Sequence, residues 1–176
     1  MSIHERPEEI EGREIAGHWE GDLIKGAGNK SAVGTLVERK SRYVLLAKLQ
    51  GSDADSVLEG FSRRMSTLPA SIRKTLTYDQ GKEMARHQEL AQRLKIRVFF
   101  ADPHSPWQRP TNENTNGLLR QYLPKGMDLS TVSQRRLTQI AAQLNGRPRK
   151  CLNFLTPEEV MQQQIKELTT VVALQI

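Results

Sequence analysis

The sequence has little cysteine, few aromatic residues and no long hydrophobic run, and these shortages exclude several classes of protein. Its 176 residues contain one cysteine, Cys151. An internal disulfide is therefore impossible, and so is a zinc site built from several thiolates. The four histidines lack metal-ligand spacing. Any metal ion would be held by carboxylates, which favours a hard cation such as Mg²⁺ or Mn²⁺.

No apolar segment approaches the roughly 18–20 residues that a membrane-spanning helix needs. The charged N-terminus, residues 1–14, has no apolar stretch of the kind found in secretory signals. We therefore expect a cytoplasmic protein. Its length and its 37% hydrophobic content suit one domain with a real core.

Basic residues outnumber acidic ones by 26 to 20, which gives a net charge of +6 and a pI near 9.7. This excess favours a polyanionic partner such as nucleic acid, although a merely basic soluble protein would show the same balance. The distribution is uneven. Basic residues flank the unusual segment 110–117 and gather again late in the chain, at Arg109, Arg120, Lys125, Arg135, Arg136, Arg147, Arg149 and Lys150.

The hydrophobic periodicity predicts strands first and then alternating helices and strands. Short breaks at 25–29 and 38–41 carry turn residues, so the first three strands should form antiparallel hairpins. This order predicts an α/β protein with a mixed five-stranded sheet flanked by helices, as in the RNase H-like fold. The predicted strands are 18–24, 31–37, 43–49, 76–78 and 97–100, and the predicted helices are 53–68, 83–94, 111–123, 131–144 and 157–168.

Three acidic residues occupy positions of chemical interest in these elements. Asp22 lies inside an apolar strand, where a carboxylate is costly to bury unless it is paired or binds a cation. Asp79 ends a short strand, at the kind of edge where ligand sites form. Glu113 opens a helix. Each has an ordinary alternative: a strand-edge or barely exposed position for Asp22, a helix cap for Asp79, and a favourable charge at a helix N-terminus for Glu113.

The helix that contains Glu113 has an unusual composition. Helical spacing puts Glu113, Asn116, Gly117 and Arg120 on one face. Three asparagines and a glycine within six residues disfavour a helix, which suggests a surface that meets something polar. Three carboxylates from two neighbouring strands and a following helix could converge on two metal ions roughly 3.5–4 Å apart, the arrangement used in phosphodiester chemistry.

Several motifs resemble the IS-thirty family of insertion-sequence transposases. These are Gly17-His18-Trp19-Glu20-Gly21-Asp22, then Thr77-Tyr78-Asp79-Gln80-Gly81, then Trp107-Gln108-Arg109 with Asn112-Glu113-Asn114-Thr115-Asn116-Gly117. The resemblance continues to Leu123-Pro124-Lys125-Gly126 and covers roughly residues 13 to 160. Asp79 and Glu113 enclose 33 residues, which is the family's spacing. Pro110 stands where the family usually has glycine, and proline is tolerated in a first helical turn.

The resemblance implies an RNase H-like DDE catalytic domain over residues 17–160, after an irregular lead-in at 1–16 and before a helical tail at 161–176. It implies that Asp22, Asp79 and Glu113 form the catalytic triad and hold two Mg²⁺ or Mn²⁺ ions. Bacterial DNA would be the substrate, as transposon ends and target, with the protein associated with the nucleoid and assembled as a homo-oligomer on DNA. No covalent protein–DNA intermediate is required.

Two other functions remain open. The first is a catalytically silent DNA-binding or inhibitory fragment of a transposase that lacks the family's N-terminal helix-turn-helix region. The second is a nuclease of the same fold acting on RNA–DNA hybrids.

Roles beyond the triad are also predicted. Trp107 could stack on a base, although a place in the core is favoured, and His18 is expected to be packed rather than catalytic. The predicted DNA contacts, for which a solvated basic helix face is the alternative, are Arg109, Asn116, Arg120, Lys125, Arg147, Arg149 and Lys150.

Overall fold

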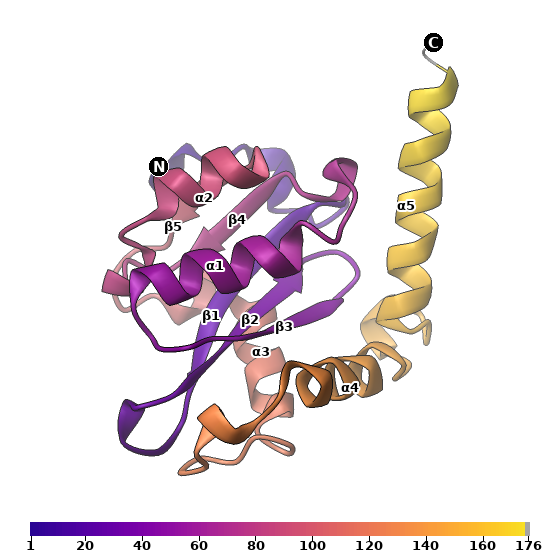
Figure 1. The fold of residues 1–176 in the computed structure, drawn as a ribbon. Coiled ribbons are helices and arrows are strands. Elements are labelled where there is room, and N and C mark those ends of the chain that lie inside the picture. The colour runs from indigo at the N-terminus through magenta and orange to yellow at the C-terminus, as the bar shows by residue number, and fades with distance from the viewer. Residues whose placement is uncertain (175–176) are drawn as a thin grey trace.

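The computed structural model describes residues 1–174 and contains one mixed sheet with strand order β3-β2-β1-β4-β5 (Figure 1). The first three strands are antiparallel, and β4 and β5 run parallel to β1. The predicted mixed five-stranded sheet is therefore confirmed. Its strands are β1 (His18–Lys25), β2 (Ala32–Glu38), β3 (Val44–Lys48), β4 (Thr75–Tyr78) and β5 (Arg97–Phe100).

Helices cover both faces of the sheet (Figure 1). One face packs against α1 (Ala54–Met65) and α2 (His87–Leu94), and the other against α3 (Pro110–Leu119) and α4 (Gln134–Asn145). Successive strand residues alternate between the two cores, because strand side chains point to opposite faces. In β1, Leu23 joins the α1 side and Ile24 joins the α3 side.

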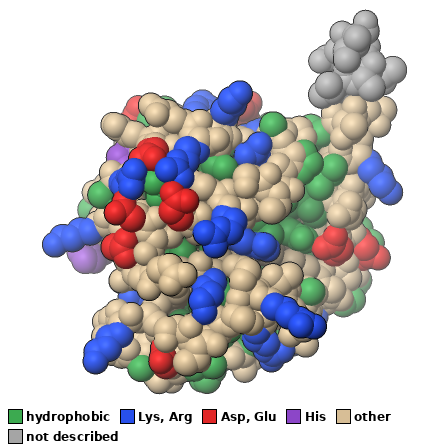
Figure 2. Space-filling model, in the orientation of Figure 1, with side chains coloured by type: hydrophobic (Ala, Val, Ile, Leu, Met, Phe, Trp, Pro, Cys, Tyr) green, Lys and Arg blue, Asp and Glu red, His purple; other side chains and the backbone are tan. Residues whose placement is uncertain are grey.

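The helix boundaries differ in detail from the sequence prediction. The predicted helix 83–94 is a 3₁₀ turn at Lys82–Met84 followed by α2, and the predicted helix 111–123 ends at Leu119. The predicted helix 131–144 starts later, because the Ser133 side chain accepts a hydrogen bond from the Arg136 amide and caps α4. The last helix, α5 (Pro157–Leu174), extends beyond its predicted end at 168 and projects from the body (Figure 1 and Figure 2). Residues 175–176 of the predicted tail lie outside the described residues.

The N-terminal lead-in packs against the domain. Residues 1–16 form two short 3₁₀ turns, at Ile3–Glu5 and Glu8–Ile10, whose isoleucines are buried. The Met1 carbonyl accepts a hydrogen bond from the Phe100 amide at 2.9 Å, so this segment lies along β5. None of the helices in residues 1–174 is long and apolar enough to span a membrane.

The parallel pairing of β1 and β4 sets the geometry of the site. Its register joins His18 to Thr75 and Glu20 to Thr77. Extended by two residues, the same register brings Asp79, directly after β4, beside Asp22 on the same face. Because β1 is the central strand, Asp22 does not lie at an edge of the sheet.

Candidate catalytic site

Asp22 lies on the face of β1 that α3 covers, and its side chain is 30% exposed. Its Oδ2 accepts a hydrogen bond from the Asn116 side-chain amide at 3.0 Å, and its Oδ1 accepts one from the Leu23 amide at 2.8 Å. Burial is the largest influence on the Asp22 carboxyl and raises its pKa, against the opposing effect of Arg109. The site would therefore favour a cation placed beside this carboxylate.

Asp79 follows β4 and contacts the same arginine. Its Oδ2 lies 3.4 Å from Nη2 of Arg109. Its Oδ1 is buried and has no hydrogen-bond partner in the described part of the chain. The alternative that Asp79 caps a helix is wrong, because the N-cap residues that follow are Gly81 and Arg86. Asp79 thus has one free, water-excluded oxygen next to Asp22.

Arg109 fills the space between the two aspartates. Its Nη1 donates to the Gly21 carbonyl at 2.8 Å and lies 3.8 Å from Oδ1 of Asp22. The guanidinium also lies over the Tyr78 ring, 5.9 Å from its centroid. A positive charge is therefore held between the two carboxylates by contacts within the chain. The predicted contact of Arg109 with DNA stays a prediction.

Asparagines attach α3 to the central strands. Asn112 is fully buried; its backbone amide donates to Oε2 of Glu20 at 2.8 Å, and its side-chain amide donates to the Glu20 carbonyl at 3.0 Å. Asn116, one turn later, holds Asp22. Two of the three asparagines that disfavour a helix locally, Asn112 and Asn116, are thus explained by their polar contacts with β1.

Glu113 lies in the first turn of α3 and is exposed. Helical spacing puts Glu113 one turn before Asn116 on the same face of α3, and Asn116 is the residue that donates to Asp22. Pro110 is the first residue of the helix, where the missing amide proton costs nothing, as expected from its position.

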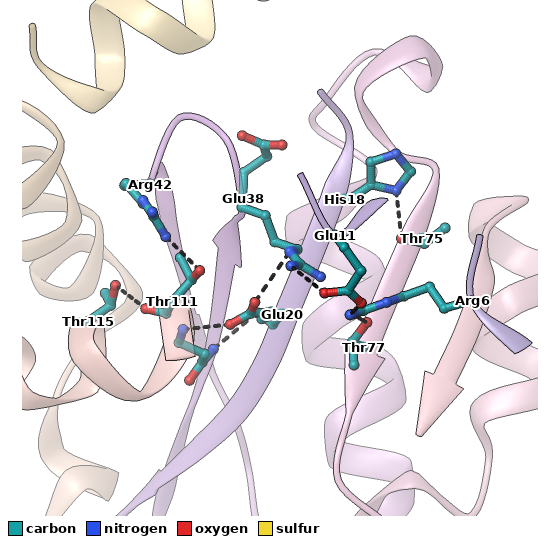
Figure 3. Close-up of polar contacts among 12 residues, drawn as sticks. Arg6, Glu11, His18, Glu20, Glu38, Arg42, Thr75, Thr77, Thr111 and Thr115 are labelled. Atoms are coloured by element: carbon teal, nitrogen blue, oxygen red, sulfur yellow. Dashed lines mark hydrogen bonds and ion pairs between the residues drawn. The ribbon is translucent and has the colours of Figure 1, made fainter. Parts of the chain in front are cut away.

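Glu20 shares a face of β1 with Asp22 but is fully buried. Its Oε1 lies 3.5 Å from Nε of Arg39, which also approaches Glu11. Glu11 in turn pairs with Arg6, whose guanidinium donates to the Thr77 hydroxyl on β4 (Figure 3). The sequence alone does not reveal this charge cluster, because Arg39 looks like an exposed turn residue.

Two single-residue predictions have opposite outcomes. His18 is buried, its Nδ1 lies 2.9 Å from the Thr75 hydroxyl, and burial lowers its pKa to about 4, so the prediction of a packed histidine is confirmed. Trp107 is 69% exposed, so the favoured prediction of a core tryptophan is wrong. The core is closed without it, by large buried residues such as Trp19 and Phe61.

The other predicted DNA contacts lie in several environments. Arg120 donates to the Lys25 carbonyl, and Arg147 donates to the Tyr122 hydroxyl. Arg149 is partly buried, and burial lowers the pKa of its guanidinium. The exposed members of the set are Lys125, Arg147 and Lys150.

The integrase core domain family matches residues 13–106, which include Asp22 and Asp79 and end before Glu113. The chain belongs to this family. It is 61% identical, over 96% of its length, to the transposase for insertion sequence element IS1086 of Cupriavidus metallidurans, of which it covers 50%. It is 50% identical, over 93% of its length, to transposase InsI for insertion sequence element IS30A of Escherichia coli, of which it covers 42%. The resemblance to IS-thirty transposases is confirmed, and the chain spans about half the length of these relatives.

A solved structure supports the fold assignment. The chain matches a chain of the simian T-cell lymphotropic virus intasome, solved with the PP2A regulatory subunit B56 gamma, with a TM-score of 0.60 and 18% sequence identity. The match covers 74% of this chain and 49% of that one. An integrase core domain of the RNase H-like class is therefore confirmed as the fold.

The donor atoms at Asp22 and Asp79 fit a hard divalent cation. They are oxygens, and both Oδ1 of Asp79 and Oδ1 of Asn116 are buried without a hydrogen-bond partner among residues 1–174. An arginine already supplies positive charge between the carboxylates. Across the same residues, no three His, Cys, Asp or Glu side chains are close enough to form a metal-binding group. Metal binding by Glu113 therefore stays a prediction.

Proposed function

We propose that this chain is the catalytic domain of a DDE transposase, which cuts DNA and joins the cut strand to a target. The observation that carries the proposal is the β1–β4 register, which brings Asp22 level with Asp79 while α3 presents Glu113 one turn from Asn116. Transposases among the relatives support it. DNA of the transposon ends and of the target is the proposed substrate, and self-assembly on that DNA is part of the proposal.

Asp22, Asp79 and Glu113 would hold two Mg²⁺ or Mn²⁺ ions. When bound, such ions activate water and stabilise the attacking and leaving oxygens of a phosphodiester exchange. The unpartnered Oδ1 of Asp79 supports its role as a ligand, because a buried oxygen without a partner favours any cation that reaches it.

The chain's own residues would fix the geometry of this site. Asn116 holds the Asp22 carboxylate in one orientation through Oδ2. Asn112 ties α3 to β1 through two hydrogen bonds to Glu20, and so fixes the height of Glu113 above the sheet. Arg109 would stay close to the reacting phosphate, because its guanidinium is attached to the Gly21 carbonyl beside Asp22.

The reaction would have two steps. Hydrolysis at the end of the element would free a 3′-hydroxyl, and that hydroxyl would then attack a phosphodiester of the target. Neither step needs a serine or tyrosine nucleophile.

The test is Mn²⁺-dependent nicking and strand transfer on supercoiled DNA. It compares the wild-type chain, Asp79→Asn and the matched control Asp55→Asn, which removes an exposed carboxylate from α1 on the opposite face. We expect nicking and joined products from the wild type and the control, and none from Asp79→Asn. Equal activity of all three proteins would refute the triad assignment. Inactivity of all three would favour the silent DNA-binding fragment.

A further inference from the structure

A pocket of about 600 Å³ lies between the N-terminal lead-in and the segment before α3, where Gln108 and Pro110 flank Arg109 in the sequence. Its volume is within the range of about 300–1,000 Å³ that small-ligand sites occupy. The carboxylates of Asp22 and Asp79 do not line it, so it is a separate site. Its chemistry comes from Arg6, Glu11, Arg13, Arg39, Trp107 and Gln108.

Two buried guanidiniums form the inner wall of the pocket. Arg39 is only 3% exposed, and its Nε lies 3.5 Å from the Glu20 carboxylate. Arg6 is 9% exposed and donates to the Thr77 hydroxyl. A buried guanidinium is costly unless an anion pairs with it, so an anion on the pocket side of these two arginines is favoured.

Glu11 occupies the position that such an anion would take. Its side chain is 60% exposed, and its carboxylate pairs with the buried Arg6 and lies 3.8 Å from Nη2 of Arg39. The two buried arginines therefore already hold an anion at the mouth of the pocket, and that anion is exposed enough to be exchanged. A phosphate carries more acceptor oxygens and can replace it on the same two arginines.

The pocket also has an aromatic surface and a basic extension. Trp107 lines it and is the more exposed of the two tryptophans, at 69%. Arg13 and Pro110 belong both to this pocket and to a second one of about 220 Å³, which adds Arg42 and Arg149. The two pockets therefore adjoin at Arg13 and Pro110, and basic side chains line both of them, which makes up a basic path.

We propose that this path binds a single-stranded DNA segment adjoining the phosphodiester that the domain processes. One phosphate replaces the Glu11 carboxylate on Arg6 and Arg39, the next lies near Arg13, and a base stacks on Trp107. A positively charged path with an aromatic platform is the usual means of binding single strands. The proposal rests on the proposed function for its location beside the reaction, whereas the binding itself requires no metal ion.

The first experiment measures the affinity for fluorescein-labelled pentathymidylate by fluorescence anisotropy in EDTA. Trp107→Ala should bind about tenfold more weakly, in line with the loss of one stacked base, whereas Trp107→Phe should retain most of the affinity. Phe154→Ala is the matched control, because Phe154 is 71% exposed and lies outside both pockets. Equal affinities of Trp107→Ala and Phe154→Ala would overturn the proposal.

The second experiment tests whether Glu11 holds the place of a phosphate. Glu11→Gln should bind pentathymidylate several-fold more tightly than Glu9→Gln, which removes the same charge from an exposed residue two positions away. Inorganic phosphate should also raise the melting temperature of Glu11→Gln more than that of Glu9→Gln, because it refills the vacated place on the two arginines. Identical behaviour of the two variants would overturn the proposal.

Failure of this proposal is distinguishable from failure of the proposed function. Mn²⁺-dependent nicking with no effect of Trp107 or Glu11 on binding would leave the catalytic function intact and remove the single-strand path. Binding that depends on both residues, in a chain that does not nick DNA, would support the path and refute the catalysis.

Discussion

Two carboxylates on the same face of β1 have opposite surroundings. Glu20 is fully buried, lies 3.5 Å from Arg39 and accepts the Asn112 amide. Asp22, two residues later, is 30% exposed and shares Arg109 with Asp79. Strand alternation makes the two equivalent, since both point to the α3 side. Their difference comes from their position along the strand. Glu20 is paired with Thr77 within β4, whereas Asp22 lies beyond the paired residues, where β4 has ended.

One strand thus carries a carboxylate that is neutralised inside the protein and another that we propose as catalytic. The Glu20 carboxylate is neutralised by Arg39 inside the protein, and it accepts the Asn112 amide, which attaches α3 to β1. At Asp22, burial raises the carboxyl pKa and one neighbouring oxygen of Asp79 has no partner within residues 1–174, so the charge is left for an incoming cation. The following predictions test this division, from the largest expected effect to the smallest.

Glu20→Gln should lose about 3–5 kcal/mol of unfolding free energy, because it leaves the buried Arg39 without its nearest carboxylate. Asp22→Asn should be as stable as the wild type or more stable. The raised pKa of Asp22 means that its ionised form costs stability at neutral pH, and asparagine removes that cost. Urea unfolding at pH 7 measures both. Similar losses in the two variants would contradict the division of roles.

His18, two residues before Glu20, should make the buried end of β1 sensitive to acid. Its pKa is lowered to about 4, so between pH 6.5 and 4 the unfolded chain binds a proton that the folded protein does not. The unfolding free energy should therefore fall by about 2–3 kcal/mol across this window. Below pH 4, His18 should cause no further loss. His18→Gln should lack this component, whereas the exposed control His104→Asn should retain it.

Asn116→Ala should raise the Mn²⁺ concentration required for half-maximal nicking by about 10–100-fold, the usual effect of removing a partner that orients a metal ligand. Asn114→Ala is the matched control, since Asn114 is exposed and lies in the same helix. The unfolding free energies of the two variants should be similar. An unchanged Mn²⁺ requirement in Asn116→Ala would show that Asp22 needs no orienting partner.

Arg109→Gln should increase the rise in melting temperature that Mn²⁺ produces, because it removes a competing cation from between Asp22 and Asp79. An effect of about 1 kcal/mol corresponds to about 2–4 °C for a domain of this size. Arg63→Gln, on the exposed face of α1, controls for the change in net charge. A smaller Mn²⁺ effect in Arg109→Gln would instead make Arg109 a partner of the bound metal.

The sequence predicts the order and type of the elements well, because hydrophobic periodicity and turn chemistry are local. The predicted arrangement also puts Asp22 and Asp79 on neighbouring strands, and β1 and β4 are neighbours in the sheet. It does not predict the charge cluster, because Glu38 and Arg39 look like exposed turn residues. Both are buried through distant partners: Glu38 accepts the Gly17 amide at 3.0 Å, and Arg39 lies close to Glu20. The exposure of Trp107 is likewise set by tertiary packing, which a single tryptophan in a proline-rich loop does not reveal.

The central position of β1 has a consequence for the order of events during synthesis. The hydrogen bond between His18 and Thr75 spans 57 residues, and the one between Asn116 and Asp22 spans 94. Contacts between such distant residues form slowly, because long loops must close before any contact compensates their entropy. Asp22 is therefore made before its partners in the site, which arrive only after α3 has been translated. If the chain cuts DNA as proposed, a nascent polypeptide that has not yet reached α3 has no assembled cutting site.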